Sequence, residues 1–282
     1  MMNTVKFVLC FVFAWILFCY TCYGQETSRY RCTYQLDMLS DTLSMEHDVQ
    51  ELYIVQIGDN ITKGYTYRNF HSDSLRTHDP NRWISLLSVS VEETFEASRR
   101  GDPNHTRNNP FYIGRFTSFL YKDYNKNEIR VTDRIDTNNF VYTDEILPQD
   151  WVILSDTATI LGYHSQKAQC HWRGREWVAW FTMEIPISEG PWKFYGLPGL
   201  ITRLYDTKHH YSFELTGFQA IEEPISMEIP RDARTAERRE LLRMRFGDRA
   251  GAISSMNMIS LGVTVQAPQA PPRHYDFIEI DY

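Results

Sequence analysis

Residues 176–187 alternate in the way expected of an extended strand that is apolar on both faces. One set of alternate positions holds Trp177, Ala179, Phe181, Met183, Ile185 and Ile187, and the other set includes Val178 and Trp180. Successive side chains of a β-strand point to opposite faces. The run therefore predicts a central strand that is covered on both sides, or one whose second face lines a pocket.

Other runs with the same period lie between turn-forming residues. Residues 30–36 alternate apolar and polar side chains, and Gly58-Asp59-Asn60 separates strand-like runs at residues 51–57 and 61–70, which predicts a hairpin. Two-sided strands need a large apolar content, and 43% of the chain is hydrophobic. This content is sufficient for a sizeable core.

A helix is expected between residues 80 and 100. Asp79 can cap it, Pro80 suits its first turn, and apolar residues recur at helical spacing until Arg100. A second, arginine-rich helix is expected within residues 231–249. We therefore expect an α+β fold that is predominantly antiparallel β: a single curved or half-barrel-like sheet with one or two packed helices.

Residues 1–24 predict a cleavable signal peptide, because Lys6 precedes an apolar stretch from Phe7 to Tyr20. This stretch is shorter than the roughly 20 residues that span a bilayer. A transmembrane anchor and a lipid anchor at Cys19 or Cys22 are the alternatives. We expect export to the periplasm or outer membrane, with no stable transmembrane segment after cleavage. Residues 25–282 are then expected to form a single β-rich domain with an extended C-terminal tail.

Removal of the signal peptide leaves two cysteines, Cys32 and Cys170. In an oxidising compartment they are candidates for a disulfide, and two buried free thiols are the alternative. The bridge would be structural, because no Cys-x-x-Cys spacing follows residue 24.

The segment Gly196-Leu197-Pro198-Gly199-Leu200-Ile201 is the most distinctive part of the chain. Pro198 and Gly199 suit the two central positions of a type II turn, and Gly196 adds a further bend. Large apolar side chains gather around this turn. They are Trp180, Trp192, Phe194, Tyr195 and Leu197, and they form a candidate ligand groove or, alternatively, one end of the core.

Residues able to carry catalysis are sparse. No Gly-x-Ser-x-Gly motif is present, and no catalytic residue, cofactor or metal site is predicted. Glu184 and Glu189 flank the aromatic cluster and are the candidates for a carboxylate-dependent hydrolase. The formal net charge of −7 argues against nucleic acid as a partner.

Several short motifs together resemble one known family. They are Gly162-Tyr163, Lys167-Ala168, Arg173-Gly174-Arg175, Ala179-Trp180-Phe181, Glu184-Ile185-Pro186 and Gly190-Pro191 through Ile201. The chain thereby resembles the GLPGLI family of exported envelope proteins of Gram-negative bacteria, most strongly over residues 160–218. The resemblance implies export and an uncharacterised role, with no established reaction. Ser165 stands where members often have a cysteine, which leaves the disulfide assignment open.

These observations lead to the expectation of a noncatalytic envelope protein that binds an apolar ligand, such as a lipid or a peptide, or a protein partner. Two other functions remain open. One is the carboxylate-dependent hydrolase, and the other is a structural accessory subunit of an outer-membrane transport complex whose strand edges pair with a partner.

Overall fold

The computed structural model describes residues 26–39, 42, 49–100, 116–135, 138–251 and 277–281. The expected signal peptide and most of the expected tail lie outside these ranges. Among the helices that are described, none has the length and apolar character needed to cross a bilayer.

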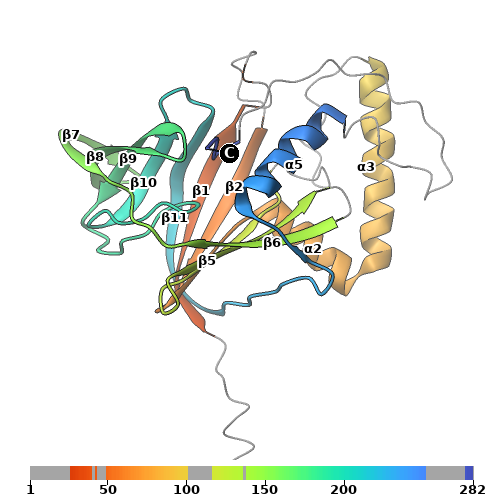
Figure 1. Cartoon of the computed structure of the whole chain (residues 1–282), viewed down its shortest axis with the longest axis horizontal. Coiled ribbons are helices and arrows are strands. Elements are labelled where there is room, and N and C mark those ends of the chain that lie inside the picture. Colours follow the sequence, from red (N-terminus) through yellow and green to blue (C-terminus); the bar gives the residue numbers. More distant parts are fainter. Residues whose placement is uncertain are drawn as a thin grey trace, which may run out of the picture.

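Twelve strands form one open sheet (Figure 1). They are β1 (Thr27–Met38), β2 (Val49–Ile57), β3 (Ile61–Thr66), β4 (Phe119–Asp123), β5 (Glu128–Ile135), β6 (Asn138–Glu145), β7 (Val152–Ile160), β8 (Tyr163–Trp172), β9 (Arg175–Thr182), β10 (Leu200–Asp206), β11 (Tyr211–Pro224) and β12 (Arg234–Thr235). Their order in the sheet is β12-β6-β5-β4-β3-β2-β1-β11-β10-β9-β8-β7. The pairing of β12 with β6 is parallel and the other pairings described are antiparallel. The expected α+β class with one predominantly antiparallel sheet is confirmed.

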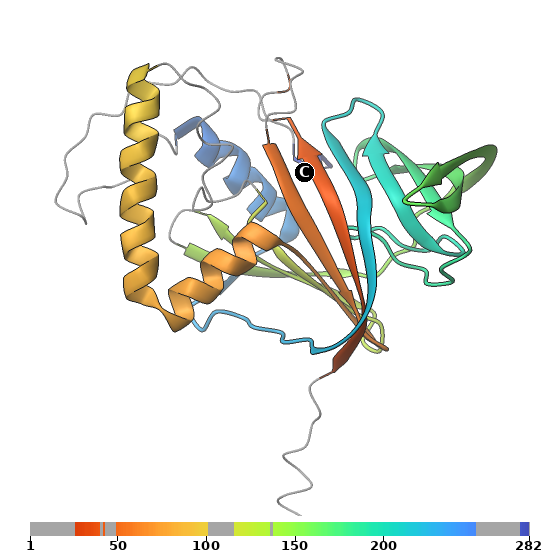
Figure 2. The same ribbon diagram turned by 180° about the vertical axis from the view of Figure 1, so that it is seen from behind.

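Three helices are described: α2 (Tyr67–His78), α3 (Pro80–Arg100) and α5 (Arg238–Gly251). The expected start of α3 is confirmed, because the Asp79 carboxylate accepts a hydrogen bond from the amide of Arg82 at 3.1 Å. Figures 1 and 2 show α3 at the side of the molecule next to α2, and α5 near β5 and β6.

The strand expected at residues 61–70 is too long. It ends at Thr66, and residues 67–70 form the first turn of α2. Two contacts hold the first turn of the helix: Asn69 donates to the carbonyl of Thr117 at 2.7 Å, and the Tyr67 and His71 rings stack one turn apart. These contacts to distant and helical neighbours outweigh the weak alternation that predicted a strand.

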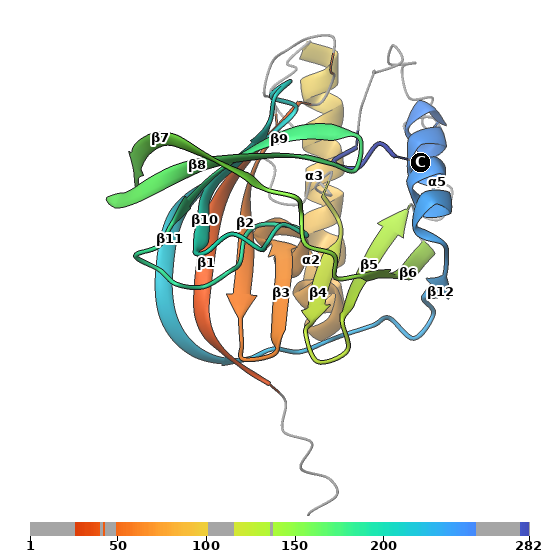
Figure 3. The ribbon, with the colours of Figure 1, turned by 60° about the vertical axis from the view of Figure 1, so that its left-hand side comes forward.

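The core lies where the sheet bends back over itself. Figure 3 shows β7, β8 and β9 crossing the direction of β1–β4. Tyr34 of β1, Trp177 of β9 and Phe213 of β11 are completely buried. On β9, Val178 on the opposite face from Trp177 is also buried, so this strand is covered on both sides as its sequence predicts. The strand ends at Thr182 and not at residue 187, and Met183 of the predicted apolar face is exposed.

Candidate functional site

The loop between β9 and β10, residues 183–199 and here called the motif loop, crosses the sheet towards β3 and β4. It contains the first four residues of the GLPGLI run, and Leu200 and Ile201 begin β10. It bends through a series of tight three-residue turns. The amides of Ile187, Glu189 and Gly199 each donate to the carbonyl two residues earlier, at 2.8 Å in all three cases. Two of these turns have proline at the centre, Pro186 and Pro198, and the fixed φ of proline is compatible with an inverse γ-turn.

The expected type II turn at Pro198-Gly199 is wrong. Such a turn requires a positive φ at its second central residue, but in this loop positive φ values occur at Trp192 and Gly196, not at Gly199. Gly199 is required for space. A Cβ atom there would lie 2.0 Å from the carbonyl oxygen of Thr182, where β9 passes. The motif thus needs its two glycines for different reasons: backbone conformation at Gly196 and close approach at Gly199.

Glu189 anchors this loop to the other half of the sheet. Its carboxylate is buried and accepts hydrogen bonds from Thr62 Oγ1 at 2.6 Å and from Lys122 Nζ at 2.7 Å. The hydroxyl of Tyr124 donates to the same carboxylate. Lys122 also donates to the carbonyl of Phe194 at 3.1 Å. The pair joins β3 and β4 to the motif loop with both charges out of contact with water.

This arrangement bears on the expected hydrolase. Glu189 is held between a lysine, a threonine and a tyrosine, so its oxygens face protein donors and not a substrate. Glu184 is exposed and accepts a hydrogen bond from the amide of His164 at 2.7 Å. The two carboxylates therefore lie in different environments. Among the residues described, no group of three or more His, Cys, Asp or Glu side chains is arranged to hold a metal ion.

The candidate groove residues mostly lie in the core. Trp192, Phe194 and Leu197 are buried, whereas Trp180 and Tyr195 are partly exposed. The Phe194 ring packs against Trp177 at a centroid distance of 4.6 Å and against Trp172 at 4.8 Å. Trp192 packs edge-to-face on Phe116 at 4.9 Å. The cluster is thus placed as a core end, with two residues at its rim.

The expected disulfide between Cys32 and Cys170 is not formed, and both residues are free buried thiols. Cys32 lies on β1 and Cys170 on β8, with three strands between them in the sheet order. Strands are spaced about 4.8 Å apart, whereas a disulfide needs Cα atoms within about 7 Å. Burial raises the pKa of the Cys32 thiol well above its usual range. The pKa of the Cys170 thiol is raised to about 12, mainly by burial and to a smaller extent by the negative charge of Glu176.

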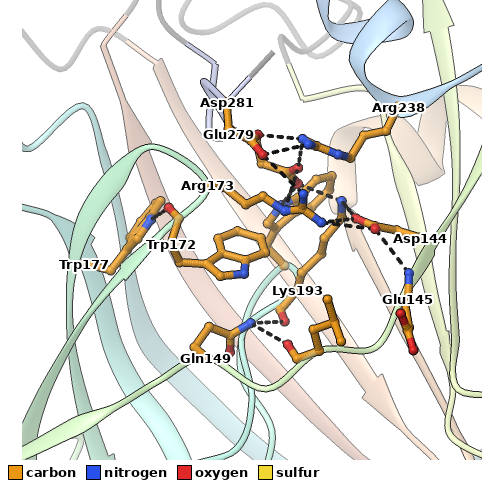
Figure 4. A network of polar contacts seen from close by, with 12 residues as sticks. Asp144, Glu145, Gln149, Trp172, Arg173, Trp177, Lys193, Arg238, Glu279 and Asp281 are labelled. Carbon is orange, nitrogen blue, oxygen red and sulfur yellow. Dashed lines mark hydrogen bonds and ion pairs between the residues drawn. The ribbon is translucent and has the colours of Figure 1, made fainter.

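A second charged cluster lies at the end of the β8–β9 hairpin and holds the segment Phe277–Asp281 (Figure 4). The Glu279 carboxylate is buried and receives Lys193 Nζ at 2.8 Å, Arg238 Nη1 at 2.8 Å and the indole nitrogen of Trp192 at 3.0 Å. Asp281 accepts two hydrogen bonds from Arg238 at 2.7 Å. These contacts join the segment to the motif loop and to α5.

Asp144 and Arg173 complete this cluster. Asp144 on β6 contacts Lys193 at 3.0 Å and Arg173 at 2.8 Å. Burial alone lowers the pKa of Lys193, but the carboxylates, Glu279 foremost, outweigh it and the net pKa is raised. Burial raises the pKa of Asp144, and the Lys193 ammonium reverses this shift, so that the net pKa is lowered.

The backbone of the same segment is also bound. The Phe277 carbonyl accepts from Arg175 Nε at 3.0 Å, and Arg175 is paired with Asp206 at 3.0 Å. The amide of Ile280 donates to the carbonyl of Arg173 at 3.0 Å. Phe277, Ile278 and Glu279 are consequently buried.

Lys193 and Glu279 were not among the site residues predicted from the sequence. A local signal was present, because each charged residue stands between apolar neighbours, in Trp192-Lys193-Phe194 and Ile278-Glu279-Ile280. A charge in such a setting is seldom buried without a partner. The pairing itself joins residues far apart in the chain, and no local pattern reveals it.

Two crystal forms of PNGF-II are similar in structure, each with 13% identity over 79% of this chain. Their TM-scores are 0.48 and 0.46, and the chain spans about a third of their length, 34% and 33%. No curated protein matches the sequence. Residues 173–203, from the β8–β9 turn through the motif loop into β10, match a family described as a protein of unknown function, Porph_ging.

Proposed function

We propose that this chain is an exported, noncatalytic protein of the periplasm or outer membrane, related to the GLPGLI family, and that it binds an extended segment of a protein partner along the edge strand β7. The observation that carries the proposal is the exposure of this edge. β7 is the last strand of the sheet and pairs on one side only, with β8.

The β7 edge has the properties of a docking strand. Val152 is 56% exposed and Ile153 is 47% exposed. The residues from Thr157 to Ile160 pair regularly with β8, after an irregularity that follows Ile153. Since only every second residue of an antiparallel strand bonds to a given neighbour, the remaining amides and carbonyls of β7 face outwards. Such an edge accepts a further strand through main-chain hydrogen bonds.

The opposite edge of the sheet is different. It ends in β12, which has only two residues, and α5 follows closely and packs against β5 and β6. Natural sheets commonly protect an edge with a short strand or a covering helix. Among the strands described, the β7 edge is neither short nor covered by a helix.

The hairpin that follows β7 supports the proposal. Ile160 pairs with Tyr163, so Leu161 and Gly162 form a two-residue turn with φ values of 50° and 84°. A bulky residue rarely adopts a positive φ, which costs about 1–2 kcal/mol. Leu161 pays this cost while 48% exposed, where it gains little from packing. Strain retained at an exposed apolar residue is typical of a contact site.

The other expected functions receive less support. Three of the five groove candidates are buried in the core, so a protein partner at the sheet edge is favoured over a small apolar ligand at that cluster. Glu189 is saturated with protein donors, which disfavours a hydrolase that depends on it. The expected accessory role in a transport complex agrees with edge pairing. Identification of the partner by crosslinking tells whether it belongs to such a complex.

The proposal is tested by crosslinking in the cells that produce the protein. A photoreactive amino acid replaces Thr157, which is exposed on β7, and crosslinked proteins are identified by mass spectrometry. The same experiment is then repeated in a Val152→Lys, Ile153→Lys background. Ile84→Lys serves as the matched control, because Ile84 is 48% exposed on α3, away from the edge.

The expected result is one envelope partner that is captured in the wild-type and Ile84→Lys backgrounds and lost in the β7 double variant. Equal capture in all three backgrounds, or no specific crosslink at all, would sink the edge-pairing proposal. Circular dichroism of each purified variant verifies that the fold is retained.

A further inference from the structure

The cluster around Phe277–Asp281 is built like a binding site for an extended peptide. Three cations, Lys193, Arg173 and Arg238, face this segment, and outside the segment Asp144 is the carboxylate of the cluster, which contacts Lys193 and Arg173. Without the segment these groups carry an excess of two positive charges. The carboxylates of Glu279 and Asp281 neutralise that excess.

The site contacts the segment through hydrogen bonds, buried apolar side chains and main-chain groups as well as through charge. The Glu279 carboxylate is 1% exposed and contacts Lys193, Arg238 and, at 3.9 Å, Arg173. It also accepts a hydrogen bond from the Trp192 indole. Arg238 receives Asp281 through both terminal nitrogens, the fork geometry that favours carboxylates. Phe277 and Ile278 are buried, and two main-chain groups of the segment are bound by Arg175 and Arg173.

The site includes a close steric fit. Gly174 has a φ of 81°, and a Cβ atom at this position would lie 2.8 Å from Cγ1 of Ile280. The β8–β9 turn thus admits the segment because it carries glycine there. Most of the site comes from parts of the chain other than the segment: β6, the β8–β9 hairpin, the motif loop and α5.

We propose that the site around Phe277–Asp281, here called the slot, is a peptide-binding site for an extended segment. In this segment two carboxylates stand two positions apart and follow a pair of apolar residues. A second copy of the chain can supply the segment. The chain between Gly251 and Phe277 would reach on the order of 80 Å if extended. Its length therefore does not determine which copy fills the slot. Exchange of an identical element preserves every contact, so its energetic cost is small.

The test uses the full chain with both Glu279→Lys and Asp281→Lys, here called the tail variant. Two added cations beside Lys193, Arg173 and Arg238 expel the segment and leave the slot open. Glu92→Lys with Glu93→Lys is the matched control, because both carboxylates are exposed on α3 and the change in charge is the same. The probe is a synthetic peptide of residues 275–282.

The peptide is expected to bind the tail variant with one-to-one stoichiometry and to raise its unfolding temperature. A peptide with glutamine in place of Glu279 is expected to bind roughly tenfold more weakly or worse, since it removes the charge that the buried Lys193 and Arg238 share and leaves Lys193 with Asp144 alone. The α3 control, whose slot is filled, should bind neither peptide appreciably. Absence of binding to the tail variant overturns the proposal. If that variant does not fold, Asp281→Lys alone replaces it, because the Asp281 side chain is 25% exposed.

Supply by a second copy is tested by mixing. The tail variant has an open slot, and an Arg238→Glu variant has a defective slot with an intact segment. Light scattering of the mixture should show a dimer that neither variant forms alone. Peptide binding without this dimer would refute the second-copy part of the proposal and leave a site for another acidic peptide. Because β7 is untouched in these variants, this test can fail independently of the edge-pairing experiment.

Discussion

Replacement of Glu189 with glutamine should be one of the most damaging conservative changes in this protein. The substitution keeps the size of the side chain but removes the charge that balances Lys122, whose side chain is completely buried. Lys122 would retain the Phe194 carbonyl at 3.1 Å as its acceptor. Removal of one partner from a buried ion pair typically costs about 3–5 kcal/mol. We expect the lower part of this range, because glutamine can still accept from Thr62.

The second arm of the experiment separates pairing from burial. Lys122→Met alone strands the Glu189 carboxylate, whereas the double variant removes both charges together. If the ion pair is responsible, the double variant will be more stable than the sum of the single effects predicts, by a coupling energy on the order of 2 kcal/mol. Urea unfolding followed by tryptophan fluorescence measures all four proteins, and the slope with denaturant checks that two-state analysis holds.

Two outcomes would refute the reasoning. A loss below about 1 kcal/mol for Glu189→Gln would place this site in the range of an exposed ion pair. Strictly additive single effects would show that Glu189 and Lys122 do not depend on each other. In either case the motif loop would not be anchored by this pair.

Further predictions address two turns, the reactivity of a thiol and the stability of the protein at low pH. Gly199→Ala should lower the unfolding temperature by several degrees, since the added Cβ would lie 2.0 Å from the Thr182 oxygen; an unchanged calorimetric transition would contradict this. Leu161→Gly should stabilise the protein by about 1 kcal/mol through relief of its positive φ, measured by urea unfolding; destabilisation would show that Leu161 packs favourably. Cys170, with its pKa raised to about 12, should react with iodoacetamide at pH 8 far more slowly in the folded than in the urea-unfolded protein; equal rates would count against its burial. Burial raises the pKa of Asp281, but hydrogen bonds from an arginine of α5 outweigh this and lower it; its stabilising contribution should thus be complete above its ordinary pKa of about 4 and lost on further acidification. An Asp281→Asn variant should lack that part of the acid dependence, and an identical pH profile would disprove it.

Local chemistry predicted the parts of this fold that depend on near neighbours. Asp79 and Pro80 mark the start of α3, and Gly58-Asp59-Asn60 connects two paired strands, because caps and turns are satisfied within a few residues. Predictions were wrong where a group far away along the chain determines the conformation of a residue. Gly199 resembles a turn glycine in sequence, but the passage of β9 beside it determines its role.

The candidate sites show the same division. An aromatic cluster near the motif was visible in the sequence, but its burial depends on Phe194 meeting Trp172 and Trp177 from other strands. The pairing of Lys193 with Glu279 joins positions 86 residues apart along the chain, as the numbering shows. Electrostatic partners at such separation leave only the weak signal of a charge among apolar neighbours.

The strand order has a consequence for how this molecule assembles. From β1 to β6 each strand lies beside its neighbour in sequence, and the same holds from β7 to β11, so each half of the sheet is built from strands that follow one another along the chain. These two halves meet at a seam where β1 pairs with β11, from Thr27 opposite Pro224 to Met38 opposite Tyr211. The two-residue strand β12, which follows β11 in the chain, pairs with β6 at the far edge. Closing that seam requires one very long loop, and its entropy must be overcome before the contacts reward it. Pairing of β1 with β11 should therefore be the slow step of folding. The buried contacts of Glu189 with Thr62 and Lys122 then stabilise the two halves in their paired arrangement.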